Sequence, residues 1–376
     1  MCGAGVAHPE LCADNIDQDC NGTVDDVPDV DGDGFTACTG DCCETTSQCA
    51  NPALVNPGAF DVPGNLVDDD CNGQVDDHAI CDRGLVDTNP SDAARGLGLC
   101  TFTTQLAKTA GVIAASYSLA DGTGMPDPRS HALLPSFGTN NVALEGTSLL
   151  VLSTGLAKVN TDPMTLSSFD FALSSGLPFQ YGGTLTSPVC TNQFLSTPHD
   201  PVMLTLTLRV PTNAHGFSFK ANYLTGDYVD SVCSNYADQF VALVQPTGLV
   251  NPLGGNVAVV QAGRNLQNIS VDLAAGNTGF LTQCVAPLSG CATSYVGCTG
   301  TSGLVGTGFD LPGTGSCNVL RGAGTGWLTV SAAATPGSQL TLRLAIWDSG
   351  DGIIDSTVLL DAFQWLATTP TPGAAF

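Results

Sequence analysis

A short acidic segment occurs twice near the start of this 376-residue chain. Residues 14–26 read DNIDQDCNGTVDD, residues 65–77 read NLVDDDCNGQVDD, and residues 29–35 between them read DVDGDGF. Each segment sets carboxylate or amide side chains at every second position ahead of a glycine, which is how a short loop wraps a hard cation such as Ca²⁺. The sequence therefore predicts three cation loops, with little regular secondary structure, at this end of the chain.

The spacing of the oxygen-bearing residues indicates which of them hold the ions. The middle loop matches positions one, three, five and six of an EF-hand, but Gly40 stands at position twelve and no helical pattern flanks the loop. Asp41 or Glu44 would then close the site, and disulfides would replace the helix pair. The predicted ligands are Asp17, Asp19, Asn21, Thr23 and Asp25 in the first copy, Asp29, Asp31, Asp33, the Phe35 carbonyl and Asp41 in the middle, and Asp68, Asp70, Asn72, Gln74 and Asp76 in the second copy. The alternative is a solvated acidic segment without ions, although a plain charge run need not repeat this order at a fixed offset.

Charge is concentrated in the same part of the chain. The protein has 35 acidic and 10 basic side chains and a formal net charge of −25, and residues 1–92 contain 18 Asp and 2 Glu with Arg83 as their only Lys or Arg. Carboxylates crowded in this way repel one another in any compact state unless cations neutralise them. Metal dependence is thus predicted on folding grounds as well. The same charge argues against binding to nucleic acid or to anionic membranes.

The sixteen cysteines also divide by region, with ten in residues 1–100 and six in residues 190–317. Even numbers in both parts predict disulfides formed in an oxidising compartment outside the cytoplasm. Which cysteines pair is left open by the sequence. A zinc site is less favoured, because the surrounding ligands are hard oxygens and the spacing lacks paired CxxC motifs. The sequence has no run of 18 apolar residues, so a membrane-spanning helix is not predicted.

Beyond residue 110 the pattern is that of strands. Residues 202–210, 217–223 and 340–346 alternate apolar and other side chains with a period of two, which places one face of each strand in a core. Further strands are expected near residues 112–120, 147–153, 238–244, 256–261, 327–332 and 356–366. The prediction is a mainly β fold, namely a jelly-roll-like β-sandwich preceded by a disulfide-rich, calcium-loop module with little regular secondary structure.

These patterns divide the chain into four parts. Residues 1–82 form the acidic, cysteine-rich calcium-binding module, which has too few large apolar residues to build a core of its own. Residues 83–110 form a connector with a short helix over about 91–98, which Asn89 and Pro90 would start. Residues 111–366 form the β-sandwich, and residues 367–376 form an extended tail.

A second set of acidic residues lies among the last strands. The tight loop after residue 346 is predicted to hold a cation, and a neighbouring loop would form a second candidate metal loop, although acids in a turn can also be simply solvated. Asp361 shares strand parity with Phe363 and Trp365, so it should face a core and must be paired or metal-bound there. The predicted ligands here are Asp348, Asp351, Asp355 and Asp361, with Asp230, Asn235 and Asp238 in the second loop.

Two stretches of the chain resemble known families. The repeated acidic segments, HPELCADNIDQDCNGTVDD and NLVDDDCNGQVDD, resemble the MopE-type metal-binding motif of secreted bacterial proteins. From about residue 91, stretches such as GVIAASYSLADG, TPHDP and IWDSGDGIIDSTVLLDAFQW resemble the choice-of-anchor L domain. The resemblance implies a secreted or cell-surface module of a bacterium, often attached through variable C-terminal anchors and without an agreed enzymatic activity. Copper enters the name of the motif family, but only His8 and His78 lie near the acidic module, and neither stands at ligand spacing from another histidine.

The function predicted from these features is an extracellular structural or cell-surface protein stabilised by several Ca²⁺ ions. One interpretation is self-association into a filament or surface layer, in which residues 1–11 or 367–376 of one copy pair with the sheet edge of another. The other is a monomer with disordered tails. The alternative is a calcium-dependent carbohydrate-binding or adhesion module that recognises cell-surface glycans. Its aromatic platform would come from Tyr223, Tyr228, Tyr236, Trp327, Trp347 and Trp365. Catalysis is not predicted, because His199 and Asp200 lack a framed nucleophile.

Overall fold

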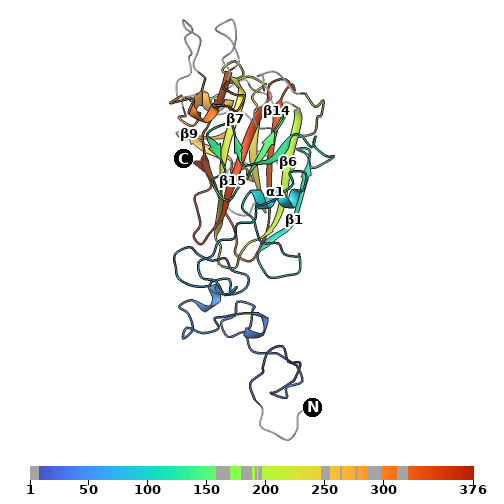
Figure 1. The fold of residues 1–376 in the computed structure, drawn as a ribbon, viewed down its shortest axis with the longest axis vertical. Coiled ribbons are helices and arrows are strands. Elements are labelled where there is room, and N and C mark those ends of the chain that lie inside the picture. Colours follow the sequence, from blue (N-terminus) through green and yellow to red (C-terminus); the bar gives the residue numbers. More distant parts are fainter. Residues whose placement is uncertain are drawn as a thin grey trace.

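The computed structural model describes residues 8–157, 170–178, 189–190, 193, 197–246, 255–262, 265–275, 278–285, 298–310 and 321–376. A β-domain forms one end of an elongated molecule, and the N-terminal residues extend from it as a stalk of loops (Figure 1). The predicted mainly β fold with a loop-built N-terminal module is therefore confirmed.

The strands of the β-domain form a curled sheet whose neighbours are mostly antiparallel. In order across the sheet they are β1 (Gly111–Ser118), β6 (Pro198–Arg209), β14 (Gln339–Ser349), β8 (Gln239–Gln245), β10 (Asn265–Ser270), β9 (Val259–Ala262), β16 (Gly373–Ala375), β13 (Leu328–Ala333), β7 (Gly216–Tyr228), β15 (Ser356–Leu366), β5 (Leu149–Ser153) and β2 (His131–Leu134). Off this path, β12 (Arg321–Gly324) pairs with β7 and with β11 (Gln283–Cys284). A separate hairpin joins β3 (Ser136–Phe137) to β4 (Asn141–Val142). Because β10 pairs with both β8 and β9, it joins the two layers of the sandwich.

The main core lies between these two layers. It contains the alternating residues of β6 and β14, such as Leu206 and Leu342, together with those of β7, such as Phe217 and Tyr223. These side chains are at most 1% exposed. The period-two pattern thus identified the inward faces of the three strongest strands correctly, since side chains of a strand alternate between the two faces of a sheet.

The outer face of one layer is more covered than the pattern predicts. Met203, which should face water, is 1% exposed and packs with Val241, Leu243 and Trp347. Leu177, from a segment distant in sequence, packs against this second cluster. The prediction of a solvated outer face is wrong here, because a loop crosses over it and supplies the apolar contact.

The predicted connector helix is present as α1 (Pro90–Gly96). The Asn89 side chain accepts a hydrogen bond from the Ser91 backbone amide at 2.9 Å, which caps the helix as expected. Ala93 and Ala94 face the main core, so the helix packs against the sheet rather than standing free. It ends two residues earlier than predicted, just before the chain turns at Gly98 with a φ of 110°.

The N-terminal module has only two single-turn 3₁₀ helices, η1 (Ala37–Thr39) and η2 (Pro52–Leu54), among its described residues. Disulfides take the place of a core. The Cys12–Cys38 bond joins the first acidic copy to the middle loop, and the Cys42–Cys71 bond joins the middle loop to the second copy. The remaining described pairs are Cys43–Cys49, Cys81–Cys100, Cys190–Cys233 and Cys284–Cys298. The predicted disulfides are confirmed. In the N-terminal module, the Cys12–Cys38 and Cys42–Cys71 bonds link each acidic loop to the next one along the chain.

Residues 56–60 attach the module to the β-domain. Asn213 exchanges two hydrogen bonds with the backbone of Phe60, at 3.0 and 2.8 Å, and Thr212 donates to the Asn56 side chain at 2.8 Å. On the connector, Lys108 donates to the Gly34 carbonyl of the middle loop. The boundary predicted at residue 82 stays a prediction, and these contacts tie Gly34, Asn56 and Phe60 to parts of the chain beyond it.

The last residues of the chain lie in its own sheet. Strand β16 pairs with β13 on one side and with β9 on the other. Phe376 stacks on Phe280 with ring centroids 5.2 Å apart. Part of the segment that was expected to extend as a tail is therefore already paired within the chain.

Asp82 fastens the end of the module to the loop before β5. It is 6% exposed and accepts hydrogen bonds from the backbone amides of Thr147 and Ser148. Burial raises the pKa of Asp82, but these hydrogen bonds outweigh it and hold the pKa below its ordinary value. The stability that Asp82 contributes is thus present at neutral pH and is lost as the pH falls through the lowered pKa.

We expect Asp82→Ala to lower the free energy of unfolding by about 1–3 kcal/mol at pH 7, because the amides of Thr147 and Ser148 lose the buried carboxylate that accepts their hydrogen bonds. The difference between wild type and variant should narrow below about pH 4, where the wild-type carboxylate begins to protonate. Urea unfolding at both pH values measures it. The exposed Asp87 provides a matched Ala variant that should change stability by about 0.5 kcal/mol or less; equal effects of both variants would contradict the assignment.

Candidate metal centres

The middle loop brings its predicted ligands together. Carboxylate oxygens of Asp29, Asp31 and Asp33 lie within 4.8 Å of one another, and so do those of Asp31, Asp41 and Glu44. Asp31 belongs to both groups and therefore lies at the centre of the site. Gly34 allows the turn with a φ of 94° and donates its amide to Asp29 at 2.9 Å.

Both proposed closing residues take part in the middle loop. Glu44 accepts hydrogen bonds from the Val30 and Ala37 amides, each at 2.9 Å, so its carboxylate reaches back over the loop. One oxygen each of Asp31, Asp33 and Asp41 is buried without a hydrogen-bond partner. Hard oxygen ligands with unused lone pairs fit a calcium-type cation well. Phe35 is buried below the loop, and the Lys108 ammonium lies 5.8 Å from its ring centroid.

The two copies of the repeat each gather around an acid that the sequence reasoning missed. In the first copy Glu10 joins Asp19 and Asp26, and in the second Asp61 joins Asp68 and Asp70. Glu10 accepts from the Asp19 amide at 2.8 Å, just as Asp61 accepts from the Asp70 amide at 3.3 Å. Glu10 and Asp61 each stand nine positions before these partners, so extending the repeat alignment upstream would have found them.

Predicted ligands of the two copies also shape the loops, including Asp68, which belongs to the second cluster as well. Asp17 accepts hydrogen bonds from the amides of Asn21 and Gly22, and Asp68 accepts them from Asn72 and Gly73, which closes each turn. Asn21 and Asn72 donate to the neighbouring carboxylates Asp26 and Asp77. The Asp76 carboxylate accepts hydrogen bonds from the Gly64 and Asn65 amides. The Asp25 amide donates to Glu10. Thr23 and Gln74 are exposed, and their amides donate to the side chains of Asn21 and Asn72.

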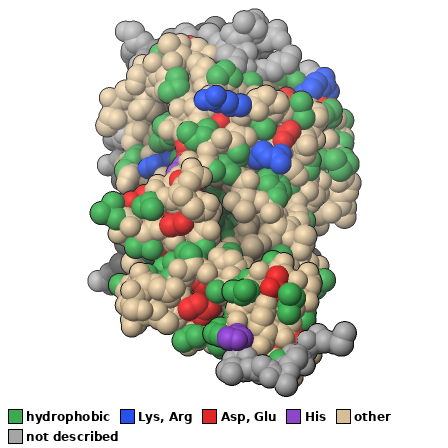
Figure 2. Space-filling model, turned by 60° about the horizontal axis from the view of Figure 1, so that its bottom comes forward, with side chains coloured by type: hydrophobic (Ala, Val, Ile, Leu, Met, Phe, Trp, Pro, Cys, Tyr) green, Lys and Arg blue, Asp and Glu red, His purple; other side chains and the backbone are tan. Residues whose placement is uncertain are grey.

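Electrostatics in the module favour a bound cation. Burial, followed by the carboxylates of Asp61 and Asp77, raises the pKa of Asp70 to about 6. Burial and neighbouring acids also raise the pKa of Asp31, Asp33 and Asp41. A cation among them would remove this repulsion. Figure 2, which brings the N-terminal end forward, shows Asp and Glu side chains there and Lys and Arg mainly on the part behind it.

Transition-metal ligands are missing from these groups. The groups in the described part of the N-terminal module contain carboxylates alone, without histidine or cysteine. His78 contacts Glu145 of the β-domain instead of an acidic loop. Cys190 and Cys233 lie close to Asp272, but the two sulfurs are bonded to each other and offer no thiolate.

At the far end of the β-domain, the structure brings together only part of the second acidic set. Asp238, Asp348 and Asp355 are 1, 1 and 7% exposed and lie close together, as their mutual effects on pKa indicate. Asp351 is half-buried and accepts from the Ile353 amide at 3.2 Å. Asp230 and Asn235 are exposed and do not join the buried acids.

Asp361 is 1% exposed, but a register shift of β15 between Asp361 and Gln364 breaks the parity with Phe363 and Trp365 from which its burial was predicted. Its oxygens accept hydrogen bonds from the backbone amides of Leu144 and Ala362, both at 2.6 Å. Burial raises its pKa to about 6. The carboxylate is thus paired with amides, and it belongs to none of the metal-binding groups among the described residues.

Two further candidate sites, the His199–Asp200 pair and the aromatic platform, consist largely of residues with structural roles. Asp200 accepts the amides of Phe171 and Leu173, at 2.8 and 3.0 Å, so both of its oxygens hold a loop in place next to His199. Of the predicted aromatic platform, Tyr223, Tyr228 and Trp347 are at most 3% exposed and belong to the interior, which corrects that part of the prediction. Tyr236 is exposed, and Trp327 and Trp365 are half-buried.

Two family models match the chain. The model described as "Choice-of-anchor L domain" matches residues 104–364, which is more than half of the sequence. The chain belongs to the choice-of-anchor L domain family. The model described as "Putative metal-binding motif" matches residues 7–26 and 50–77, which contain the two copies of the repeat but not the middle loop. Both resemblances predicted from the sequence are confirmed, in the predicted order.

The two families together point to a secreted or surface protein of bacteria. In the part of the chain that the structure describes, no helix has the length and apolarity needed to cross a membrane. No match was found among curated proteins. Among solved structures, TmCBM61 in complex with beta-1,4-galactotriose is similar, with 7% identity, coverage of 67% of this chain and 87% of that chain, and a TM-score of 0.24. At this TM-score the likeness bears on neither the fold nor the ligands of the choice-of-anchor L protein.

We expect Asp31→Asn to weaken calcium binding at the middle loop on the order of tenfold, because Asp31 belongs to both groups of carboxylates in this loop and the change removes its charge from each. Calorimetric calcium titration of the full chain, compared with wild type, measures the loss of one binding event. Asp230→Asn is the matched control, because Asp230 is exposed and belongs to neither group. Identical titrations for wild type and Asp31→Asn would show that the middle loop holds no ion.

Proposed function

We propose that the protein is an extracellular structural unit in which Ca²⁺ ions stiffen an acidic stalk that carries a β-domain at a bacterial cell surface. The observation that carries this proposal is the middle loop, where buried oxygens of Asp31, Asp33 and Asp41 have no hydrogen-bond partner. A buried carboxylate oxygen without a hydrogen-bond partner is costly, and a cation removes that cost. The protein would act through its rigidity and its place on the surface, without catalysing a reaction.

Calcium is favoured by the chemistry of the ligands. The three N-terminal clusters offer carboxylates alone, which hard cations prefer and which copper and zinc use less readily than imidazole or thiolate. Flexible loops that supply many oxygens suit Ca²⁺ better than Mg²⁺, because Mg²⁺ requires a near-ideal octahedron. The calcium ions would act in series with the disulfides, since each loop is tied to the next through a cystine.

The module depends on these ions because it has little else to hold it. Its buried apolar residues among 8–82 are few, namely Phe35, Cys43, Val55 and Ala59. A small disulfide-rich segment with so little core gains much of its order from bound metal. The β-domain, in contrast, has an extensive core between two layers.

We expect chelation to expose the N-terminal module first. With EDTA, an endoproteinase that cleaves after acidic residues and needs no metal should cut within residues 8–82 at least about tenfold faster, since ligand-stabilised segments open more often without the ligand. Mass spectrometry of the fragments locates the cuts, and added calcium should restore protection. Asp31→Asn in calcium should give an intermediate rate. Equal cleavage with and without EDTA would contradict calcium stiffening.

The proposal also includes self-association of the protein. The predicted donation of residues 367–376 to another copy would require β16 to leave its place between β13 and β9. Negative-stain electron microscopy in calcium and in EDTA distinguishes a filament or layer from single particles. A surface unit displayed as monomers would remain compatible with the stiffened stalk.

Glycan binding is a second candidate, favoured by a groove at the junction of module and β-domain. The groove has a volume of about 580 Å³, and its lining includes Phe60, Asp61, Asp70, Asn72 and Trp365. A half-buried indole and a carboxylate cluster in one groove would offer a sugar a stacking surface and, with an ion bound, a metal for its hydroxyls. Figure 2 shows the hollow where the two parts meet.

If the groove binds glycans, we expect calcium-dependent signals on a glycan array that Trp365→Ala lowers on the order of tenfold, because the stacking surface is lost. Trp327→Ala is the matched control, since Trp327 is also half-buried but does not line the groove. Both variants would first be checked for an unchanged circular dichroism spectrum. An array that stays silent in calcium would exclude this candidate and leave the structural role.

A further inference from the structure

Asparagine is followed directly by glycine at two places in this chain, Asn21–Gly22 and Asn72–Gly73, and at no other. The two pairs occupy the same position in the two copies of the acidic repeat. All four residues are exposed, and a Cβ atom on either glycine would meet no atom within 4 Å. Both pairs are thus open to water and sterically unhindered.

An asparagine that precedes glycine readily loses its side-chain amide, since glycine has no Cβ to shield its backbone nitrogen. In this reaction the glycine nitrogen gives up its proton and attacks the Cγ atom of the asparagine. The bond from Cγ to the side-chain nitrogen breaks, that nitrogen leaves with the proton as ammonia, and a cyclic succinimide remains. Water then opens the ring to aspartate or isoaspartate. The net change consumes one water and releases one ammonia.

Hydrogen bonds engage both reacting groups in the first copy. The Gly22 amide, which would have to lose its proton, donates it to the Asp17 carboxylate at 3.0 Å. The Asn21 side-chain nitrogen, which would have to leave, donates to Asp19 at 2.9 Å and to Asp26 at 3.0 Å. The side-chain oxygen of Asn21 accepts the backbone amide two residues further on, at 2.9 Å. Every polar atom of this side chain therefore has a partner.

The second copy repeats these contacts. The Gly73 amide donates to the Asp68 carboxylate at 2.9 Å. The Asn72 side-chain nitrogen donates to Asp70 at 3.0 Å and to Asp77 at 2.8 Å. Its oxygen again accepts the backbone amide two residues further on, at 2.8 Å. The same set of contacts in both copies shows that the contacts belong to the motif and do not depend on the surroundings of one loop.

These contacts oppose the cyclisation in two ways. An amide nitrogen that has lost its proton is an anion, and here it would form directly against a carboxylate, so Coulomb repulsion disfavours that step. The side-chain nitrogen must also leave two charge-assisted hydrogen bonds before it can depart as ammonia. Cyclisation therefore requires the loop to open first, and its rate follows the fraction of molecules in which the loop is open.

We propose that Asn21 and Asn72 are deamidation sites that the closed acidic loops protect, so that a loop which stays open is altered irreversibly. The protection by the closed loop stands by itself, whereas its dependence on calcium rests on the function proposed above. Isoaspartate adds one carbon to the main chain between the asparagine and the glycine. The turn that the glycine amide closes on Asp17 or Asp68 then no longer fits, and the stalk does not regain its ions.

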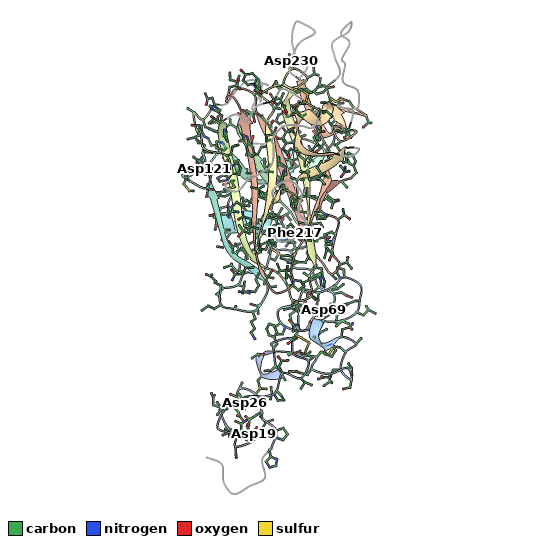
Figure 3. The ribbon with its side chains drawn as sticks, turned by 180° about the vertical axis from the view of Figure 1, so that it is seen from behind. Asp19, Asp26, Asp69, Asp121, Phe217 and Asp230 are labelled. Carbon is green, nitrogen blue, oxygen red and sulfur yellow. A yellow bond between two sulfur atoms is a disulfide. The ribbon has the colours of Figure 1, made fainter. Side chains whose placement is uncertain are left out.

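The two sites differ in how firmly their loops are held. Figure 3 shows Asp19 of the first copy far from the β-domain and Asp69 of the second copy close to it. The Asn56 amide, next to the contacts with the β-domain, donates to the Asp69 carbonyl at 2.9 Å. Because a loop with fewer anchors opens more often, we expect Asn21 to be converted before Asn72 when the ions are removed.

Mass spectrometry of peptides from the full chain tests this protection. The protein is kept at mildly alkaline pH in calcium, in EDTA, or reduced and unfolded in urea, and the asparagine, aspartate and isoaspartate forms are measured over time. We expect both sites to convert at least about tenfold more slowly in calcium than in urea, with EDTA between the two. Asn15 is the internal control, because it is exposed in the first copy but precedes an isoleucine, and it should convert slowly even in urea.

The outcomes separate the inference from the proposed function. Conversion that is as fast in calcium as in urea would overturn the protection by the loops. Conversion that is equally slow in calcium and in EDTA would retain the protection and overturn its link to calcium stiffening. Added calcium should restore the protease resistance of residues 8–82 after brief chelation, but not after both sites have been converted.

A pair of matched variants locates the protecting contact. Asp17→Ala removes the acceptor of the Gly22 amide and should speed conversion at Asn21 in calcium on the order of tenfold, while Asn72 stays unchanged. Asp68→Ala should have the reverse effect. Each variant thus contains an unaltered copy as its own reference. Unchanged rates at both sites would overturn the proposal; a variant that speeds both sites has lost its fold, and the wild-type rates in calcium and urea then decide.

Discussion

The excess of carboxylates over cations is the constraint on which the rest of the structure depends. Some of the described carboxylates are paired with backbone amides, as Asp82 and Asp361 are, and some with arginine, as Asp92 and Asp127 are. Amide pairing fixes loops to the β-domain without any ion. The carboxylates of the acidic loops instead gather in groups without Lys, Arg or His, and in the middle loop one oxygen each of Asp31, Asp33 and Asp41 is buried without a hydrogen-bond partner.

Local features of this design were predictable from the sequence. The turns of the acidic loops depend on residues within about five positions, so their order in the chain reveals them. The inward faces of β6, β7 and β14 follow from strict alternation, because each strand has one face in the main core. Glu10 and Asp61 were also within reach, since they repeat at the same offset as the rest of the motif.

Features that depend on strand pairing could not be predicted from the sequence. Asp238 meets the Ser349 amide only because β8 and β14 are neighbours in the sheet, and no local pattern encodes that pairing. Met203 is buried because Leu177 crosses the outer face of its strand. Asp361 finds the amide of Leu144, a partner 217 positions away in the sequence. In each case a long-range contact decides what a locally ambiguous polar or apolar residue does.

The two kinds of acidic site differ in what an ion would do for the fold. In the stalk, the ligands are close in sequence and the apolar core is small, so binding an ion and ordering the loop are the same event. In the β-domain, the main core already fixes the registers of the strands. A buried carboxylate there can be held without any ion, as the amides of Leu144 and Ala362 hold Asp361. An ion would thus create order in the stalk, whereas the β-domain draws its order from its core.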